Sequence, residues 1–411
     1  MLLVNIKELC GIRETPVFLK GEQMGELPTI SNAYLEIDKD TIADYGPMNQ
    51  LSPKKWKEKE VLDLRGQFVL PAWCDCHTHL VYVGSREGEF VDKIKGLSYR
   101  EIADRGGGIL NSARRIEEAS EEAIFEESWI RLEEVRKMGT GAIEIKSGYG
   151  LTVEGELKML RVIKKLKKKS KMPMRVTFLG AHAFPQEYQY DHQGYLDLIC
   201  QGMIPKIAEE KLAHYVDAFC EEGFFSPDEI QQILDAAHYY GLKGKLHANQ
   251  LSNSGGVQLG VKNNLLSVDH LECIGEKEIK ALRNSKVIPV LLPTAAFFLQ
   301  MDYPPARTMI DKGLGLVLAT DYNPGSSPSG NIPFLIALSC IQMLMTPEEA
   351  INAVTNNAAF AMELEAEVGN IAKGKKANLV ITKPMPSLAF LPYAFGNNMV
   401  DQVMIGGKLL Y

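Results

Sequence analysis

The sequence has few cysteines and no long apolar run, and both absences limit what the protein can be. Seven cysteines among 411 residues form an odd and sparse set, which is typical of reduced thiols rather than of a disulfide framework. No apolar run reaches the ~18 residues that a membrane-spanning helix needs. The N-terminus, MLLVNIK, is too short and too soon charged for the apolar core of a signal peptide. We therefore expect a soluble protein of the cytoplasm.

Neither positive nor negative charge is in large excess. The formal net charge is −7, from 45 Lys+Arg and 52 Asp+Glu, which argues against a surface devoted to nucleic acid. The one basic run, residues 164–171, follows apolar residues at nearly helical spacing, so we expect its lysines on the solvated side of a helix and at its C-terminus. The glycine run 106–108 follows no phosphate-loop pattern. These observations favour a small-molecule substrate over nucleic acid or membrane as the partner.

Two kinds of pattern divide the chain. Residues 1–66 and 366–411 consist of short apolar or alternating runs separated by turn residues, and they predict one small β-rich domain built from both termini. In residues 67–365, short apolar runs alternate with helical stretches, which is typical of parallel βα units. Eight candidate strands predict an α/β fold, a (β/α)8 TIM-like barrel. The candidate strands are residues 67–76, 141–145, 175–180, 215–220, 242–247, 265–270, 287–292 and 314–320, and the main helical patterns are 120–137, 152–169, 228–240 and 346–361.

The chain has only eight histidines, and four of them fall at the ends of candidate strands. His77 and His79 end the first strand, where a spacing of two points both rings to one face. His247 and His270 end the fifth and sixth strands, and Asp321 follows the eighth. Each residue alone could be a buried histidine or a capping aspartate. That explanation does not account for the position of all five at the C-terminal face, where barrel active sites lie. Imidazoles with a carboxylate suit zinc or iron and leave one position for water.

Motifs around these residues carry a resemblance to known enzymes. Residues 71–79, PAWCDCHTH, resemble the PGxxDxHxH opening of the amidohydrolase superfamily, with Ala72 in place of the usual glycine. Further segments resemble the imidazolonepropionase family: residues 105–109 (RGGGI), 146–151 (KSGYGL), 178–183 (FLGAHA), 267–272 (SVDHLE) and 319–326 (ATDYNPGS). The resemblance covers nearly the whole chain. It implies a hydrolase that opens the ring of 4-imidazolone-5-propanoate to give N-formimidoyl-L-glutamate, the third step of histidine degradation.

The resemblance also implies a metal site and catalytic groups. The implied ligands of one Zn²⁺ or Fe²⁺/Fe³⁺ ion are His77, His79, His247 and Asp321. A single metal is expected because the fourth candidate strand contains no lysine that could be carboxylated to bridge two ions. The implied catalytic residues are Asp321, His270 and His182. Asp321 would exchange the proton of the attacking water, and the two histidines would donate hydrogen bonds to the ring carbonyl.

The implied substrate pocket has one departure from the family pattern. Its expected residues are Arg86, Tyr99, Tyr149, His182, Gln250, Asn323, Gly325 and Ser326. Arg86 would hold the propanoate with two hydrogen bonds. Many family members have HAxE after the fifth strand, whereas this chain has HANQ, ending in Gln250. An amide can form hydrogen bonds but cannot act as a base, which favours Asp321 as the group that handles the proton.

Two other functions remain open at this point. A related mononuclear amidohydrolase could deaminate a heterocycle, but a nucleobase offers no flexible carboxylate for Arg86 to bind. A catalytically inactive barrel scaffold would be expected to lose metal ligands, and all four are present. The sequence alone leaves open whether the metal is zinc or iron and whether the chain forms a homodimer. Residues 90–108 are the segment expected to close over the substrate, because of their length and glycines.

Overall fold

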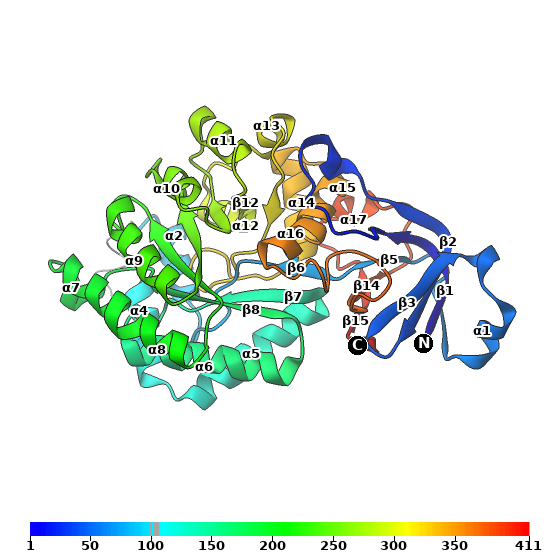
Figure 1. Cartoon of the computed structure of the whole chain (residues 1–411), viewed down its shortest axis with the longest axis horizontal. Helices are drawn as coiled ribbons and strands as arrows, with labels where there is room; N and C mark the ends of the chain where they lie inside the picture. The colour runs from blue at the N-terminus through cyan, green and yellow to red at the C-terminus, as the bar shows by residue number, and fades with distance from the viewer. Residues whose placement is uncertain (98–100, 102–106, 411) are drawn as a thin grey trace.

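The computed structural model describes residues 1–97, 101 and 107–410, and places the chain in two sheets with surrounding helices. One sheet is an eight-stranded parallel barrel, and the other is a mixed sheet to which both ends of the chain contribute (Figure 1). The N- and C-termini lie near each other at this second sheet. In the described part of the chain, no helix combines the length and apolar character needed to cross a membrane.

The barrel contains a strand at each of the eight predicted places. Its strands run in the spatial order of the sequence: β6 (Trp73–Asp75), β7 (Thr140–Lys146), β8 (Met174–Ala181), β9 (Tyr215–Cys220), β10 (Lys243–Ala248), β11 (Ser267–His270), β12 (Ile288–Leu291) and β13 (Val317–Leu318). Every neighbouring pair is parallel. The carboxyl ends of the strands therefore meet at one face, as the barrel fold requires.

The two ends of the barrel sheet meet beyond β6 and β13. The segments after these strands form a parallel bridge between Thr78 and Tyr322. The backbone N–H of Asp321 donates to the carbonyl of His77, and that of His79 donates to the carbonyl of Tyr322. This seam brings the first and last predicted metal ligands of the chain together by backbone hydrogen bonds alone.

The first expected barrel strand, residues 67–76, is divided between the two sheets. Its first half is β5 (Phe68–Pro71), which pairs with the terminal sheet, and only β6 belongs to the barrel. Ala72 separates them, and its backbone N–H donates to the carbonyl of Asn378. An apolar run carries no mark of the sheet that it joins, so periodicity could not reveal this division.

The terminal sheet draws strands from both ends of the chain. Its members are β1 (Leu2–Cys10), β2 (Thr29–Asp38), β3 (Thr41–Pro47), β4 (Val61–Asp63), β5, β14 (Leu379–Thr382), β15 (Val400–Ile405) and β16 (Lys408–Leu409). The central order is β14-β5-β1-β2, so residues near 380 and near 5 share a core. The boundaries 1–66, 67–365 and 366–411 remain a proposal for how the chain divides.

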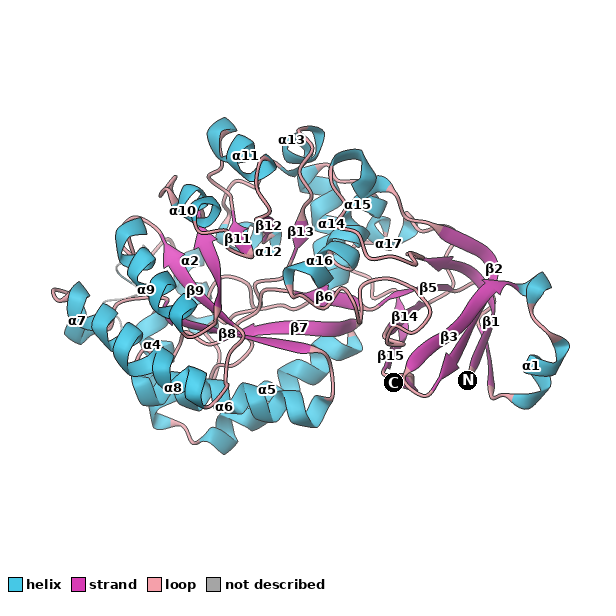
Figure 2. Ribbon diagram, in the orientation of Figure 1, coloured by secondary structure: helices cyan, strands magenta, loops and turns pink. Residues whose placement is uncertain are grey.

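Helices cover the outside of the barrel strands, with α5 against β7, α6 against β8 and α9 against β9 and β10 (Figure 2). Their N-caps are residues whose side chains accept a backbone N–H, such as Ser120, Thr152 and Ser226. The α-helices are α1 (Pro53–Glu58), α2 (Glu87–Ile94), α4 (Ile109–Glu118), α5 (Glu121–Lys137), α6 (Val153–Ser170), α7 (His192–Asp197), α8 (Ile204–Glu209), α9 (Pro227–Tyr239), α10 (Gly256–Lys262), α11 (Glu276–Arg283), α12 (Pro293–Leu299), α13 (Ala306–Asp311), α14 (Ile332–Met343), α15 (Pro347–Ala353), α16 (Asn356–Ala361) and α17 (Phe390–Tyr393). Shorter elements are the 3-10 turns Gly21–Gly25, Met48–Gln50 and Gln186–Tyr188 and the π-helix Leu198–Met203.

The helical pattern over residues 346–361 forms two helices, α15 and α16, rather than one. The chain breaks at Thr355, whose φ of −126° and ψ of −89° lie outside the helical region. The side-chain amides of Asn356 and Asn357 then donate to the carbonyls of Val17 and Leu19. The break lets the second helix tie the N-terminal segment to the barrel.

Candidate active site

Four predicted ligands meet at the C-terminal face of the barrel. His77 and His79 lie in the segment directly after β6, His247 lies in β10, and Asp321 follows β13. All four side chains are buried. Asp321 adopts a left-handed backbone conformation, with φ of +53°, which a non-glycine residue holds only when its surroundings fix it. The backbone bonds of the barrel seam supply that constraint.

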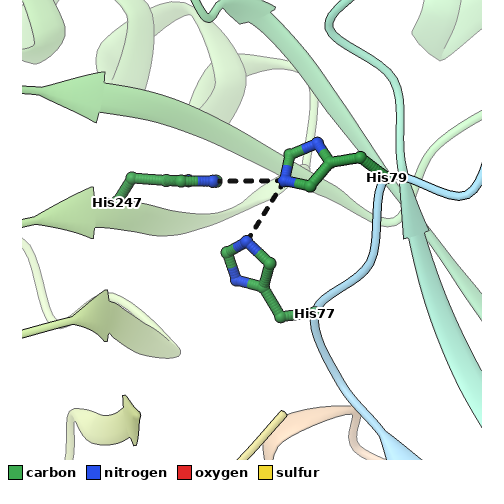
Figure 3. A group of neighbouring side chains, drawn as sticks. All are labelled: His77, His79 and His247. Atoms are coloured by element: carbon green, nitrogen blue, oxygen red, sulfur yellow. Dashed lines mark hydrogen bonds between the residues drawn. The ribbon is translucent and has the colours of Figure 1, made fainter. Parts of the chain in front are cut away.

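The nitrogens of His77, His79 and His247 lie close enough together to hold one metal ion. Nε2 of His79 is 3.2 Å from Nε2 of His77 and 3.4 Å from Nε2 of His247 (Figure 3). Oδ1 of Asp321 is 3.6 Å from Nε2 of His77 and 3.5 Å from Nε2 of His79. Four ligands about 2.0–2.1 Å from one zinc ion lie roughly 3.3–3.4 Å from one another. His77, His79 and His247 form a group that could hold one metal ion, and Asp321 approaches two of its three nitrogens.

In His77 and His247, a carboxylate beside the other ring nitrogen favours the tautomer that a metal needs. Nδ1 of His77 lies 2.6 Å from a carboxylate oxygen of Asp269, and Nδ1 of His247 lies 3.0 Å from one of Asp217. A carboxylate draws the proton to Nδ1 and leaves the Nε2 lone pair free for a metal. Burial lowers the pKa of His77 well below its usual value, and the nearby Lys146 and neighbouring imidazoles lower this pKa further. The ring is therefore neutral, as a ligand must be.

Those two carboxylates belong to a network of charges inside the barrel, which we call the interior charge network: Glu144, Lys146, Asp217, Lys245 and Asp269. All five side chains are fully buried. Nζ of Lys146 lies 2.8 Å from Glu144, 2.8 Å from Asp217 and 3.7 Å from Asp269, and Lys245 binds the other oxygen of Glu144. Burial opposes the charge on Lys146, but the three carboxylates outweigh burial and raise its pKa. Lys146 is therefore an ammonium group.

Two further histidines border the metal site in different states. Burial opposes the charge on His270, but the Glu272 carboxylate, 3.3 Å from Nδ1, outweighs burial and raises the pKa of His270 to about 9. Burial lowers the pKa of His182 to about 3. Nδ1 of His182 lies 2.9 Å from the carbonyl of Gly148, which can only accept, so this nitrogen carries the proton. His270 is a donor at neutral pH, whereas Nε2 of His182 is an acceptor.

A pocket of about 570 Å³ is lined by three of the four candidate ligands, His79, His247 and Asp321. Tyr149 and the two bordering histidines line its wall, together with apolar side chains. The residues around the pocket are His79, Arg86, Lys93, Ile109, Tyr149, His182, Phe219, Phe224, His247, Gln250, Leu251, His270, Leu299, Asp321, Asn323, Gly325 and Ser326. The pocket thus gathers every substrate residue expected from the sequence except Tyr99, which lies outside the described residues.

Arg86 reaches the pocket at Gly325. A side-chain carbon at position 325 would lie 2.4 Å from Nη1 of Arg86 and 2.9 Å from its Cζ, so only glycine leaves room for this guanidinium. The opposite edge of Arg86 is already bound, because Nε and Nη2 donate to Glu89 at 2.9 and 2.5 Å. The Nη1 side therefore remains for a ligand.

Loops around the pocket are held by their own hydrogen bonds. The amide oxygen of Asn323 accepts the backbone N–H groups of Gly325 and Ser326, and its amide nitrogen donates to Ser326 Oγ at 2.7 Å. The carboxylate of Glu221 accepts the backbone N–H groups of Gln250 and of the two residues after it. These hydrogen bonds fix the backbone of Gln250 at the pocket wall. Its side-chain amide is uncharged.

Several of these groups were given no role by the sequence analysis, although Asp269 and Glu272 lie within the 267–272 motif. The carboxylates of Asp217 and Asp269 lie beside Nδ1 of His247 and His77, respectively. The carboxylate of Glu272 lies beside Nδ1 of His270, and Lys93 lines the pocket. For Asp217 and Asp269, the signal in the sequence was an ionisable residue within an apolar strand. The remaining histidines, at 192, 214 and 238, do not line the pocket: His192 pairs with Glu229, and Nδ1 of His214 accepts a backbone N–H.

Comparisons with known proteins show the family of this chain. The amidohydrolase family profile matches residues 68–410. Imidazolonepropionase of Flavobacterium johnsoniae is 56% identical over 410 residues, covering 100% of this chain and 99% of that protein. The imidazolonepropionase of Christiangramia forsetii is 53% identical over 411 residues, with both chains fully covered, and that of Clostridium tetani is 42% identical over 393 residues, covering 95% and 93%.

Solved structures share the fold at low sequence identity. A triazine hydrolase variant superposes with a TM-score of 0.77 at 14% identity, covering 100% of this chain and 94% of the other. Guanine deaminase of E. coli and 5-methylcytosine deaminase of Klebsiella pneumoniae each give a TM-score of 0.75 at 15% identity. These two matches cover 100% of this chain and 99% and 97% of the others. At such identities the likeness shows the architecture.

Proposed function

This chain belongs to the amidohydrolase family and, within it, to the imidazolonepropionases, and on that premise we propose that it opens the ring of 4-imidazolone-5-propanoate by hydrolysis. Water adds to the ring carbonyl carbon, the bond from that carbon to the ring nitrogen breaks, and the nitrogen takes up a proton. The product is N-formimidoyl-L-glutamate, whose new carboxylate is the former ring carbonyl. The free cysteines of the described chain support the cytoplasm as its compartment.

We propose that His77, His79, His247 and Asp321 hold one Zn²⁺ or Fe ion. When bound, such an ion lowers the pKa of water from about 15.7 toward about 7 and so supplies a nucleophile at neutral pH. A single ion is favoured because Lys146, the lysine nearest these ligands, is an ammonium group bound by carboxylates. An ammonium nitrogen has no lone pair with which to form the carbamate that a second ion would need.

Asp321 is the proposed proton carrier of the reaction. It accepts the proton of the attacking water and delivers it to the leaving ring nitrogen. His270, which is protonated, donates a hydrogen bond to the ring oxygen as negative charge develops there. His182 takes a different role from the one expected from the sequence: since Nδ1–H is used by Gly148, Nε2 accepts a hydrogen bond from a ring N–H. Tyr149 packs beside this imidazole, with ring centroids 5.4 Å apart.

One observation carries the proposal: three of the four proposed metal ligands, His79, His247 and Asp321, line the same pocket as a guanidinium seated against Gly325. The ligands alone would also suit a deaminase. A cation in the same pocket matches a substrate whose ring carries a flexible carboxylate. Tyr99 remains a proposed member of this pocket from the family resemblance, and the homodimer remains a proposed assembly.

Metal removal tests the proposal directly. We expect the purified protein to consume 4-imidazolone-5-propanoate, followed by loss of the ring's ultraviolet absorbance. A chelator should abolish turnover, and added Zn²⁺ or Fe²⁺ should restore it. Bound metal without turnover of this compound, together with release of ammonia from amino-heterocycles, would replace the proposal by the deaminase alternative. Turnover that survives complete metal removal would refute the metal site.

Gly325→Ala should weaken substrate binding. The new methyl group would displace the guanidinium of Arg86, and the loss of a charge-assisted hydrogen bond is expected to raise KM by about tenfold to a hundredfold. The kcat value and the metal content should change little, because position 325 is not a ligand. Gly88→Ala is the matched control, since a side-chain carbon there meets nothing within 4 Å. An unchanged KM in Gly325→Ala would remove Arg86 from the substrate site.

A further inference from the structure

A second cation, Lys93, reaches the same end of the pocket as Arg86. Arg86 is the N-cap residue of α2, and Lys93 lies seven residues further along the chain, in the last turn of this helix. Nζ of Lys93 donates to the carbonyl of Gly325 at 3.3 Å, and Nη1 of Arg86 lies beside the same glycine. The two cationic groups therefore converge on one point of the pocket wall.

The charge of Arg86 is already balanced. Glu89 binds two nitrogens of the guanidinium, and its other oxygen accepts the backbone N–H of Gly108. Among the described residues that line the pocket, the one carboxylate is Asp321, a proposed metal ligand. The uncompensated positive charge beside Gly325 is therefore that of Lys93. It would balance the single negative charge of a propanoate.

The surroundings of Lys93 fix its position and make its charge costly. The ammonium group lies 5.9 Å from the ring centroid of Phe298, which stacks on Phe90 of α2. Burial lowers the pKa of Lys93, and the nearby Arg86 lowers it further. A carboxylate placed between the two cations would relieve both penalties, whereas a neutral group would relieve neither.

We infer that Lys93 is a specificity-determining residue for the proposed reaction: its ammonium binds the side-chain carboxylate of the substrate beside Arg86 and so selects acidic over neutral imidazolones. The inference rests on the proposed function and extends it, because neither the family resemblance nor the motifs assign a role to this lysine. Arg86 supplies directional hydrogen bonds, and Lys93 supplies the net charge.

The test compares 4-imidazolone-5-propanoate with the corresponding propanamide, which keeps the ring and loses the charge. In Lys93→Met, the ratio of kcat/KM for acid over amide is expected to fall by about tenfold to a hundredfold, mainly through KM for the acid. Lys93→Arg should retain most of the preference. Lys95→Met removes an exposed lysine next to the end of the same helix, and its ratio should match that of the wild type.

The outcomes separate this inference from the function on which it rests. Wild-type turnover with an unchanged acid-to-amide ratio in Lys93→Met would overturn the inference alone. An equal loss on both substrates would also overturn it, because that pattern indicates a structural role. If the wild-type protein consumes neither compound, the proposed function fails and the inference fails with it.

Discussion

Asp321→Asn is expected to lower kcat by about a hundredfold to ten-thousandfold, the range attributable to a lost general acid–base group. Asparagine keeps the shape of the side chain and an oxygen that can approach the histidines, but its amide cannot take up the proton of water. Gln250, another polar residue that lines the pocket, is also an amide and cannot substitute as a base. Steady-state kinetics with metal-loaded protein, with the metal content measured in the same sample, check the prediction.

The control is Asp302→Asn, which removes an exposed carboxylate that does not line the pocket. It should retain wild-type kcat. Melting temperature separates chemistry from folding, because Asp321 also holds a strained backbone position in the barrel seam. If Asp321→Asn binds metal and keeps nearly full kcat, the proton is carried by another group and the proposed role of Asp321 is wrong.

The main elements of the fold could be predicted because barrel strands can be recognised from the local sequence. Each of the eight strands is a short apolar run between helical stretches, and every one is present. The partner sheet of a run is not local information, which is why residues 67–76 divide between two sheets. The break in the 346–361 pattern likewise depends on carbonyls near residue 18, more than 300 positions away in the chain.

The histidine cluster that could hold a metal could be predicted for a similar reason. Its residue types and their places at strand ends are both visible in the sequence, and the barrel brings strand ends together. The supporting carboxylates are a different case, because Asp217 and Asp269 acquire their roles only through the histidines that face them. The tautomer of His182 could not be predicted from the sequence. It is set by the carbonyl of Gly148, which lies 34 residues away in the chain and determines which ring nitrogen carries the proton.

The interior charge network links the barrel to its metal site through one lysine. Asp217 and Asp269, both within reach of the Lys146 ammonium, each approach Nδ1 of a ligand histidine. The network holds three carboxylates and two lysines. Without the Lys146 charge, the carboxylates would repel one another in a region that water does not reach. Lys146 therefore acts as a positioning residue that fixes two histidine rings at once.

Lys146→Met should lose both stability and metal affinity. Removing one partner of a buried ion pair costs about 3–5 kcal/mol in the free energy of unfolding, and loss of outer-shell support lowers metal affinity by about tenfold to a hundredfold. Urea unfolding and competition with a chelator of known affinity measure the two effects. Glu144→Gln is the matched variant, because Glu144 binds both lysines but no ligand histidine. It should lose stability while keeping metal affinity close to that of the wild type. An equal loss of affinity in both variants would mean that metal binding merely follows global stability, and Lys146 would then have no separate positioning role.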